Sequence, residues 1–194
     1  NPKEGQVWYN DTLNQIKGRL TIPAAWASGG NLNTARHAIT GFGTQTAGLG
    51  AGGQNGPVRA LSEEYNGSSW SEGNDLSSTR YYAGGAGTQT AALIFGSYPN
   101  ANTTEEYGGT SWTTGGDIPQ ATSDLSGAGT QTAALAFGWS SSPNNITASY
   151  DGSSWTAVPA TIPSAPVSQG RGIGTQTAAL MCGYDSTPGK TTDE

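Results

Sequence analysis

Pairs of neighbouring acidic residues are the feature of this sequence that comes closest to a catalytic apparatus. They stand at Glu63-Glu64 and Glu105-Glu106, and Asp193-Glu194 occupies a corresponding place. Glycosidases use two carboxyl groups on opposite sides of the bond that they cleave. Here, however, the pairs recur on a repeated outer strand, where neighbours point to opposite faces and one carboxylate of each pair would be solvated. We therefore expect the pairs to be structural.

Other side chains with catalytic or metal-binding chemistry are isolated. His37 is the single histidine, which rules out a multi-histidine metal site, and its place beside Arg36 predicts a surface or loop position. Neither a Gly-x-Ser-x-Gly elbow nor a Walker-type stretch occurs. The oxygen donors Asp75, Asp117 and Asp124 lack the regular ligand spacing of a calcium loop. The sequence predicts no catalytic residue, no metal site and no cofactor.

The single cysteine, Cys182, lies in the apolar segment Leu180–Gly183. In such a segment a cysteine is expected to be a small buried hydrophobic residue rather than a nucleophile. Because no second cysteine is present in these 194 residues, no disulfide can form within them.

Composition excludes several functional classes. A formal charge of −6 and a pI near 4.6 argue against binding to a nucleic-acid backbone, which needs clustered basic residues. No stretch approaches 18 apolar residues, so membrane insertion is not expected. Thirty glycines and a hydrophobic content of 34% favour short strands and tight turns over amphipathic helices, and six Trp and eight Tyr indicate a folded chain.

A repeat determines the expected architecture. The segment Gly-Thr-Gln-Thr-Ala recurs at intervals of 44, 42 and 45 residues, beginning at Gly43, Gly87, Gly129 and Gly174. A second marker is spaced by 44, 42 and 43 residues, at Trp26, Trp70, Trp112 and Trp155. Two markers in phase with this period are typical of propeller blades or another repeat array.

Four short strands are expected in each unit. In the second unit a first strand over Tyr81–Ala86 is followed by a turn and by an apolar second strand, Thr90–Gly96, of the kind that is buried on both faces. A third strand over Thr103–Tyr107 and a fourth beginning at Ser111–Thr113 complete the unit. The same pattern fits residues 125–156.

The third and fourth strands form a hairpin with a Tyr and a Trp five residues apart. Asn66-Gly67 and Asp151-Gly152 predict two-residue turns between these strands, because both residue types readily adopt positive φ. We expect the Tyr and Trp side chains to pack in the core between neighbouring units, with ligand stacking as the alternative.

Each end of the repeat region contains part of a unit. Thr191–Glu194 align with Thr103–Glu106, and residues 26–30 match residues 70–73. Propellers often complete one blade from both termini. We therefore predict an all-β fold with a β-propeller over residues 20–194, built of four-stranded blades, four in number, one of them closed by both termini. The alternative is a longer array with further blades after Glu194.

Residues 1–19 do not share the repeat. The segment Gly5–Gly18 predicts two short strands around a turn, that is, an N-terminal β-hairpin or docking segment. Since an isolated hairpin is marginally stable in water, it should dock on the propeller, another subunit or a preceding domain through Trp8 and Tyr9, or cap an open sheet edge.

These motifs resemble known repeats. An apolar strand ending in Gly (Leu93–Gly96), a Tyr-turn-Trp hairpin and a following Leu-to-Arg segment (Leu76–Arg80) are similar to kelch-type propeller repeats. The near-identical Gly-Thr-Gln-Thr-Ala hairpins and the opening Gly5–Asn10 resemble structural, fibre and appendage proteins of aquatic bacteriophages. This resemblance implies a virion protein, such as a tail fibre or capsid-surface component, located on the phage particle or otherwise extracellular.

The leading hypothesis is a non-enzymatic virion structural protein whose propeller acts as a display or attachment platform. Its partners would be other virion proteins or identical subunits, together with a host surface glycan or receptor. The most divergent loops follow the second strands and should share one face of a ring: residues 54–60, 98–102, 139–146 and 184–190. On that face Tyr98, Trp139 and Tyr184 are the candidate ligand-binding residues. The alternatives are a lectin-like carbohydrate-binding propeller and a propeller glycosidase.

Overall fold

The computed structural model describes residues 7–10, 15–18, 27–98, 101–138, 147–159, 168–184 and 192–193. Within these ranges the regular structure is entirely β, and every paired strand is antiparallel. The predicted all-β class is therefore confirmed. No helix of the length and apolarity needed to cross a membrane is found among the described residues.

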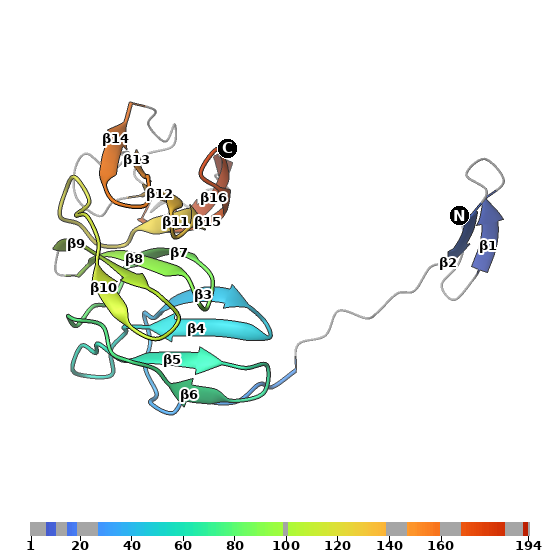
Figure 1. Cartoon of the computed structure of the whole chain (residues 1–194), viewed down its shortest axis with the longest axis horizontal. Helices are drawn as coiled ribbons and strands as arrows, with labels where there is room; N and C mark the ends of the chain where they lie inside the picture. Colours follow the sequence, from blue (N-terminus) through green and yellow to red (C-terminus); the bar gives the residue numbers. More distant parts are fainter. Residues whose placement is uncertain are drawn as a thin grey trace.

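The described residues contain seventeen strands in five sheets, and Figure 1 labels β1 to β16. β1 (Val7–Asn10) and β2 (Gln15–Gly18) form a hairpin of their own. Sheet I contains β3 (Thr40–Thr44), β4 (Ala47–Ala51), β5 (Ser62–Tyr65) and β6 (Trp70–Glu72). Sheet II contains β7 (Gly84–Gly87), β8 (Ala92–Ser97), β9 (Ala101–Tyr107) and β10 (Trp112–Thr114).

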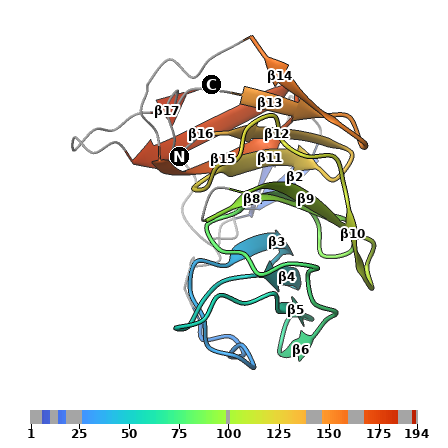
Figure 2. The ribbon, with the colours of Figure 1, turned by 90° about the vertical axis from the view of Figure 1, so that its left-hand side faces the viewer.

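Sheets III and IV continue the series. Sheet III contains β11 (Ser126–Thr130), β12 (Ala133–Phe137), β13 (Thr147–Tyr150) and β14 (Trp155–Val158). Sheet IV contains β15 (Ser168–Thr175), β16 (Ala178–Tyr184) and β17 (Thr192–Asp193). In each sheet the strands are hydrogen-bonded in chain order, so that every unit is a meander (Figure 2). The predicted two strands of the N-terminal segment are confirmed, whereas the side chains of Trp8 and Tyr9 lie outside the described residues.

The recurring Gly-Thr-Gln-Thr segment makes the tight turn between the first and second strands. Its glycine has a positive φ in each sheet, for example 107° at Gly129. A Cβ at Gly129 would lie 2.2 Å from the carbonyl oxygen of Ala133, which no side chain could tolerate. Glycine is required here both for its conformation and for its lack of a side chain.

The first strands of the four sheets lie side by side at very short distances. A Cβ on Gly127 of β11 would lie 2.4 Å from the carbonyl oxygen of Gly85 in β7, and one on Gly172 of β15 would lie 2.4 Å from that of Gly127. All four first strands line one cavity of about 540 Å³, whose walls are mostly glycine and alanine. The four sheets are not closed into a ring, so the predicted closure of a four-bladed propeller by both termini is not borne out, and the propeller architecture stays a prediction.

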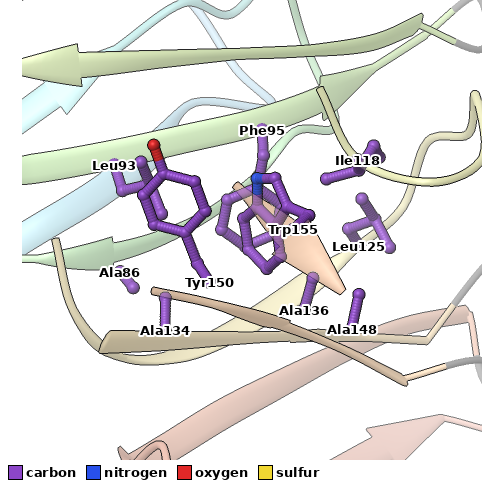
Figure 3. Packing of buried hydrophobic residues seen from close by; sticks show 10 residues of the cluster. All are labelled: Ala86, Leu93, Phe95, Ile118, Leu125, Ala134, Ala136, Ala148, Tyr150 and Trp155. Carbon is purple, nitrogen blue, oxygen red and sulfur yellow. The ribbon is translucent and has the colours of Figure 1, made fainter. Parts of the chain in front are cut away.

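The core lies between successive sheets. Phe95 of sheet II and Trp155 of sheet III meet edge to face, with ring centroids 4.7 Å apart, among the buried residues that Figure 3 shows. The Tyr and Trp of each outer hairpin are directly paired across the strands, and Tyr150 and Trp155 have centroids 4.9 Å apart. Their predicted role in packing between units is confirmed.

The prediction of a first strand over Tyr81–Ala86 is wrong at its start, because β7 begins at Gly84. The backbone of Tyr82 is left-handed, with a φ of 53°, and its N–H points to the carbonyl oxygen of Ala38 instead of to β8. The chain therefore enters the sheet from an irregular segment at the end of the strands.

The predicted two-residue turns are also wrong. Because Tyr65 pairs with Trp70, four residues separate the strands of this hairpin. The side-chain oxygen of Asn66 accepts the N–H groups of Ser68 and Ser69, and the positive φ falls on Gly67 alone. Asn66 thus acts by capping the loop with its side chain rather than by adopting positive φ.

Candidate functional site

In two of the three acidic pairs the first residue is buried in an ion pair with an arginine of the connection that leads into its sheet. The side chains of the third pair, Asp193-Glu194, lie outside the described residues. Glu63 of β5 binds Arg36, and Glu105 of β9 binds Arg80, with 2.6 Å between Oε1 and Nη2 in the second pair. Both ion pairs are almost completely inaccessible to solvent. Each carboxylate also accepts backbone N–H groups from the incoming connection, such as that of Ser77 on Glu105. These carboxylates fix the connection between sheets.

In the same two pairs the second acidic residue binds the next sheet. Glu64 accepts a hydrogen bond from the hydroxyl of Tyr107, and Glu106 accepts one from Tyr150. Burial, followed by this hydrogen bond, raises the pKa of both tyrosines, so they remain donors at neutral pH. The structural role predicted for the pairs is confirmed for Glu63-Glu64 and Glu105-Glu106. The second carboxylate of each of these two pairs, which was expected to be solvated, is half-buried, because the neighbouring sheet supplies a donor.

The other described side chains considered for catalysis or metal binding do not come together in one site. His37 is exposed at a bridge to Gln54, as predicted for a surface histidine. Asp117 accepts a hydrogen bond from Asn102 at 3.3 Å, and Asp75 is exposed. Among the described residues no three His, Cys, Asp or Glu side chains come together as metal ligands would.

Cys182 is exposed, so the prediction of a buried position is wrong. Its counterparts Phe95 and Phe137 are buried, and Phe95 is packed against the Trp of the following sheet. No described residue covers Cys182 in the same way.

A cluster of three tyrosines is the surface feature best suited to bind a ligand. The ring centroids of Tyr82 and Tyr98 each lie 5.1 Å from that of Tyr81. Tyr82 is 38% exposed and Tyr98 is 49% exposed, more than any other large hydrophobic side chain of the described residues except Ile173. Aromatic faces of this kind combine apolar area with hydroxyl groups and lose little conformational entropy on binding.

Backbone hydrogen bonds between the sheets hold this cluster. The N–H of Tyr82 donates to Ala38 at 3.4 Å, and the N–H of Asp124 donates to the carbonyl oxygen of Tyr82 at 2.9 Å. The N–H of Tyr98 donates to the carbonyl oxygen of Tyr81 at 3.0 Å. The cluster is therefore fixed to the ends of three sheets.

Ala38, Tyr82 and Asp124 occupy the same place in successive units, five residues before the turn glycine, and all three have left-handed backbones with φ of 53–58°. Non-glycine residues in this conformation are uncommon and concentrate at functional sites. Here the three left-handed positions precede the first strands of successive sheets, and the Asp124 carboxylate lies close enough to act electrostatically on Tyr81. Desolvation, with smaller contributions from Tyr98, Tyr82 and Asp124, raises the pKa of Tyr81.

Of the three predicted ligand-binding residues, only Tyr98 can be placed in this cluster. Trp139 lies outside the described residues, and Tyr184 ends β16 with its side chain outside them. The sequence did not indicate Tyr81, Tyr82 or Asp124 as site residues. The first two belong to a segment that the sequence predicts to be a strand, and no sequence signal marks the left-handed position, which holds Ala, Tyr and Asp in the three units.

The cavity that the four first strands line has few side chains that could bind a ligand or take part in catalysis. Phe42 and Ile173 are the large side chains among its glycine and alanine lining, and no ionisable side chain lines it. No protein-family model matches this sequence, and no curated protein shows a significant match.

Proposed function

We propose that this chain is a non-enzymatic attachment module of a virion, with its sheets as the blades of a β-propeller that displays ligand-binding side chains. The virion assignment rests on the resemblance of the repeats to phage structural proteins. The attachment role is supported by the exposed tyrosine cluster of Tyr81, Tyr82 and Tyr98, held on the ends of the sheets.

The engagement of the acidic pairs supports a binding role over a glycosidase. Glu63 and Glu105 are buried in ion pairs, and Glu64 and Glu106 accept hydrogen bonds from tyrosines. None of the four has the free carboxylate that would flank a scissile bond. A rigid scaffold with irregular segments at one end of its strands is the usual design of a binding protein.

The test is attachment of the fluorescently labelled chain to a panel of aquatic bacteria. We expect saturable attachment to some strains, and a decrease of roughly two- to tenfold in affinity for Tyr98→Ala, which corresponds to one aromatic contact. Tyr98→Phe is the matched control, because it retains the ring and should retain most of the attachment. Attachment that is equal in wild type and Tyr98→Ala would exclude the cluster as the binding site.

A lectin-like function is the second candidate, and the composition of the cluster favours it. Sugar rings present apolar faces and hydroxyl groups, which match the faces of Tyr82 and Tyr98 and a nearby acceptor such as Asp124. Immobilised oligosaccharides of bacterial surfaces are the appropriate probe. Binding abolished by Tyr82→Ala would support this function, whereas attachment to cells without binding to any oligosaccharide would favour a protein receptor.

A further inference from the structure

The backbone beneath the tyrosine cluster is repeated in sheet I with other side chains. In sheet II the N–H of Tyr98 donates to the carbonyl oxygen of Tyr81 at 3.0 Å. At the positions 44 residues earlier, the N–H of Gln54 donates to the carbonyl oxygen of His37 at 2.9 Å. The same backbone pair therefore forms with a histidine and a glutamine, and it does not require the two tyrosines.

The left-handed position leads to the same conclusion for Tyr82. Its counterparts are Ala38 in sheet I and Asp124 in sheet III, and the three φ angles lie within 53–58°. Because alanine takes this conformation with neither a ring nor a hydroxyl group, the backbone does not require an aromatic residue there. The exposed rings of the cluster are thus apolar area that the repeated backbone does not explain, which is typical of a binding surface.

A buried hydroxyl group fixes two of the rings in place. Ser97, which is 3% exposed, accepts the N–H of Tyr81 at 3.3 Å and donates to the carbonyl oxygen of Tyr98 at 2.9 Å. The rings of Tyr82 and Tyr98 are tilted by 41° and 55° against that of Tyr81, so they are not stacked face to face. With neighbouring centroids 5.1 Å apart, one small group can contact more than one ring without rearrangement of the backbone.

The charge beside the cluster is negative. The half-buried Asp124 is joined to Tyr82 through its backbone N–H, and its carboxylate accepts the hydroxyl of Ser123 at 3.1 Å. It takes part in neither of the two ion pairs found among the described residues. Desolvation raises the pKa of Tyr81, with smaller contributions from the other two tyrosines and from Asp124, and no basic side chain is among the causes.

The arginine next to the cluster in sequence does not offset this charge. The side chain of Arg80 is 1% exposed, and its guanidinium binds Glu105 and Thr103 inside sheet II. The whole chain carries a formal charge of −6, which also attracts cations. Since the faces of aromatic rings are negative as well, a cation gains energy from the rings and from the carboxylate, whereas an anion is repelled by both.

From this combination we propose that the tyrosine cluster and Asp124 form a binding site for a quaternary ammonium group, such as the trimethylammonium group of choline. A primary ammonium has three N–H donors that must exchange water for protein acceptors, whereas a quaternary ammonium has none and suits ring faces. This inference rests on the proposed attachment function, because it names the ligand class of the same cluster.

The test compares choline with 3,3-dimethyl-1-butanol, which has the same shape without the charge, by titration calorimetry of the full chain at constant ionic strength. We expect saturable binding of choline and at least about tenfold weaker binding of the uncharged alcohol. Equal affinities would show an apolar site without preference for a cation and would overturn the inference, as would the absence of choline binding.

Sheet I supplies variants that should keep the backbone intact. Tyr82→Ala and Tyr98→Gln introduce the residues that sheet I has at Ala38 and Gln54, so we expect an unchanged urea midpoint. Each should weaken choline binding by roughly two- to tenfold, the effect of losing one ring contact. Choline affinity that is the same in both variants as in the wild type would overturn the inference.

A charge variant keeps the test decisive if the tyrosine variants do not fold. Asp124→Asn retains all three rings and removes the charge, and it should weaken choline binding by roughly tenfold while binding of the alcohol stays the same. Asp117→Asn is the matched control, because Asp117 is an exposed carboxylate outside the cluster and should leave choline affinity unchanged. An equal effect of the two variants would mean that only the net charge matters and would overturn the site.

Two sources of the group are distinguished by cosedimentation with vesicles. Binding to phosphatidylcholine vesicles that free choline displaces would support a lipid headgroup as the ligand. Binding to free choline but not to these vesicles would support a soluble or polymer-linked source. Binding to phosphatidylglycerol vesicles, which lack the ammonium group, with the same affinity as to phosphatidylcholine vesicles would contradict the proposed site.

Failure of this inference can be told apart from failure of the proposed function. Attachment to cells that depends on Tyr98, without any binding of choline, would leave the attachment function and remove the ammonium ligand. Choline binding without attachment to any strain would have the opposite meaning, since the site would stand and the attachment function would fall.

Discussion

Replacing the buried ion pair between Arg80 and Glu105 should reveal strong coupling between the two residues. The Arg80 guanidinium donates to Glu105 at 2.6 Å and to the carbonyl oxygens of Thr103 at 3.0 Å and Gly96 at 3.3 Å. Its Nε has no partner among the described residues. Either single substitution, Arg80→Thr or Glu105→Ala, would leave one charge buried without its counterion.

The expected loss of unfolding free energy is about 3–5 kcal/mol for each single variant, the usual effect of breaking a buried ion pair. The double variant removes both charges, so its loss should not exceed that of the worse single variant. Sheet III supplies the precedent, because Thr122 and Ala148 stand at the corresponding positions and are fully buried without any charge. The coupling energy should therefore be at least about 2 kcal/mol.

Urea unfolding followed by tryptophan fluorescence measures all four corners of this double-mutant cycle. Asp117→Ala, which removes an exposed carboxylate, serves as a control and should change the unfolding free energy by less than about 0.5 kcal/mol. Additive losses in the double variant would refute the reasoning, since they would mean that the two charges do not compensate each other.

Three further measurements test other contacts. Gln131→Ala leaves two backbone carbonyls of sheet II without a donor and should lower the unfolding free energy by about 1–3 kcal/mol in urea titrations, whereas Gln131→Glu, which retains the length, should not restore it. Hydrogen bonds from the backbone of Ser154 and Ser153 lower the pKa of Asp151 to about 2. The stabilisation of the folded state by the ionised Asp151 is therefore present above its ordinary pKa of 3.8 and is lost as the pH falls toward 2. Asp151→Asn, with the side chain that Asn66 has in sheet I, should flatten this acid dependence of the urea midpoint. Burial raises the pKa of Tyr107 above its ordinary value of 10.0, so stability from its protonated form is lost as the pH rises beyond 10, and Tyr107→Phe should reduce the alkaline decrease of the midpoint.

The strands and hairpins could be predicted from the sequence because they depend on local residue types. A turn glycine followed by Thr and Gln, and an apolar run such as Leu93–Phe95, carry their conformational preference within a few residues. The register of the outer hairpin is the exception, since Tyr65 pairs with Trp70 across a four-residue loop and not across the predicted two-residue turn.

The contacts between units could not be predicted in this way. The burial of Glu105 depends on Arg80, 25 residues away, and the donor to Glu64 comes from Tyr107 in the next sheet. The exposure of Cys182 depends on whether another sheet covers it. For the same reason the tyrosine cluster escaped prediction, since it forms where three irregular segments meet at the ends of different sheets.

The side-chain amides of Gln89, Gln131 and Gln176 donate to main-chain carbonyls of the preceding sheet, and these contacts have a consequence for how such a chain could arise. Each glutamine reads only main-chain carbonyls, at Gly48, Ala92 and Ala134, so the residue type on the accepting strand is free to change. A duplicated unit inserted into the gene could form the same glutamine-to-carbonyl contacts with the sheet before it and the sheet after it. Unequal recombination could therefore lengthen or shorten the series while these glutamine contacts are retained, and each new copy could diverge at the ends of its strands.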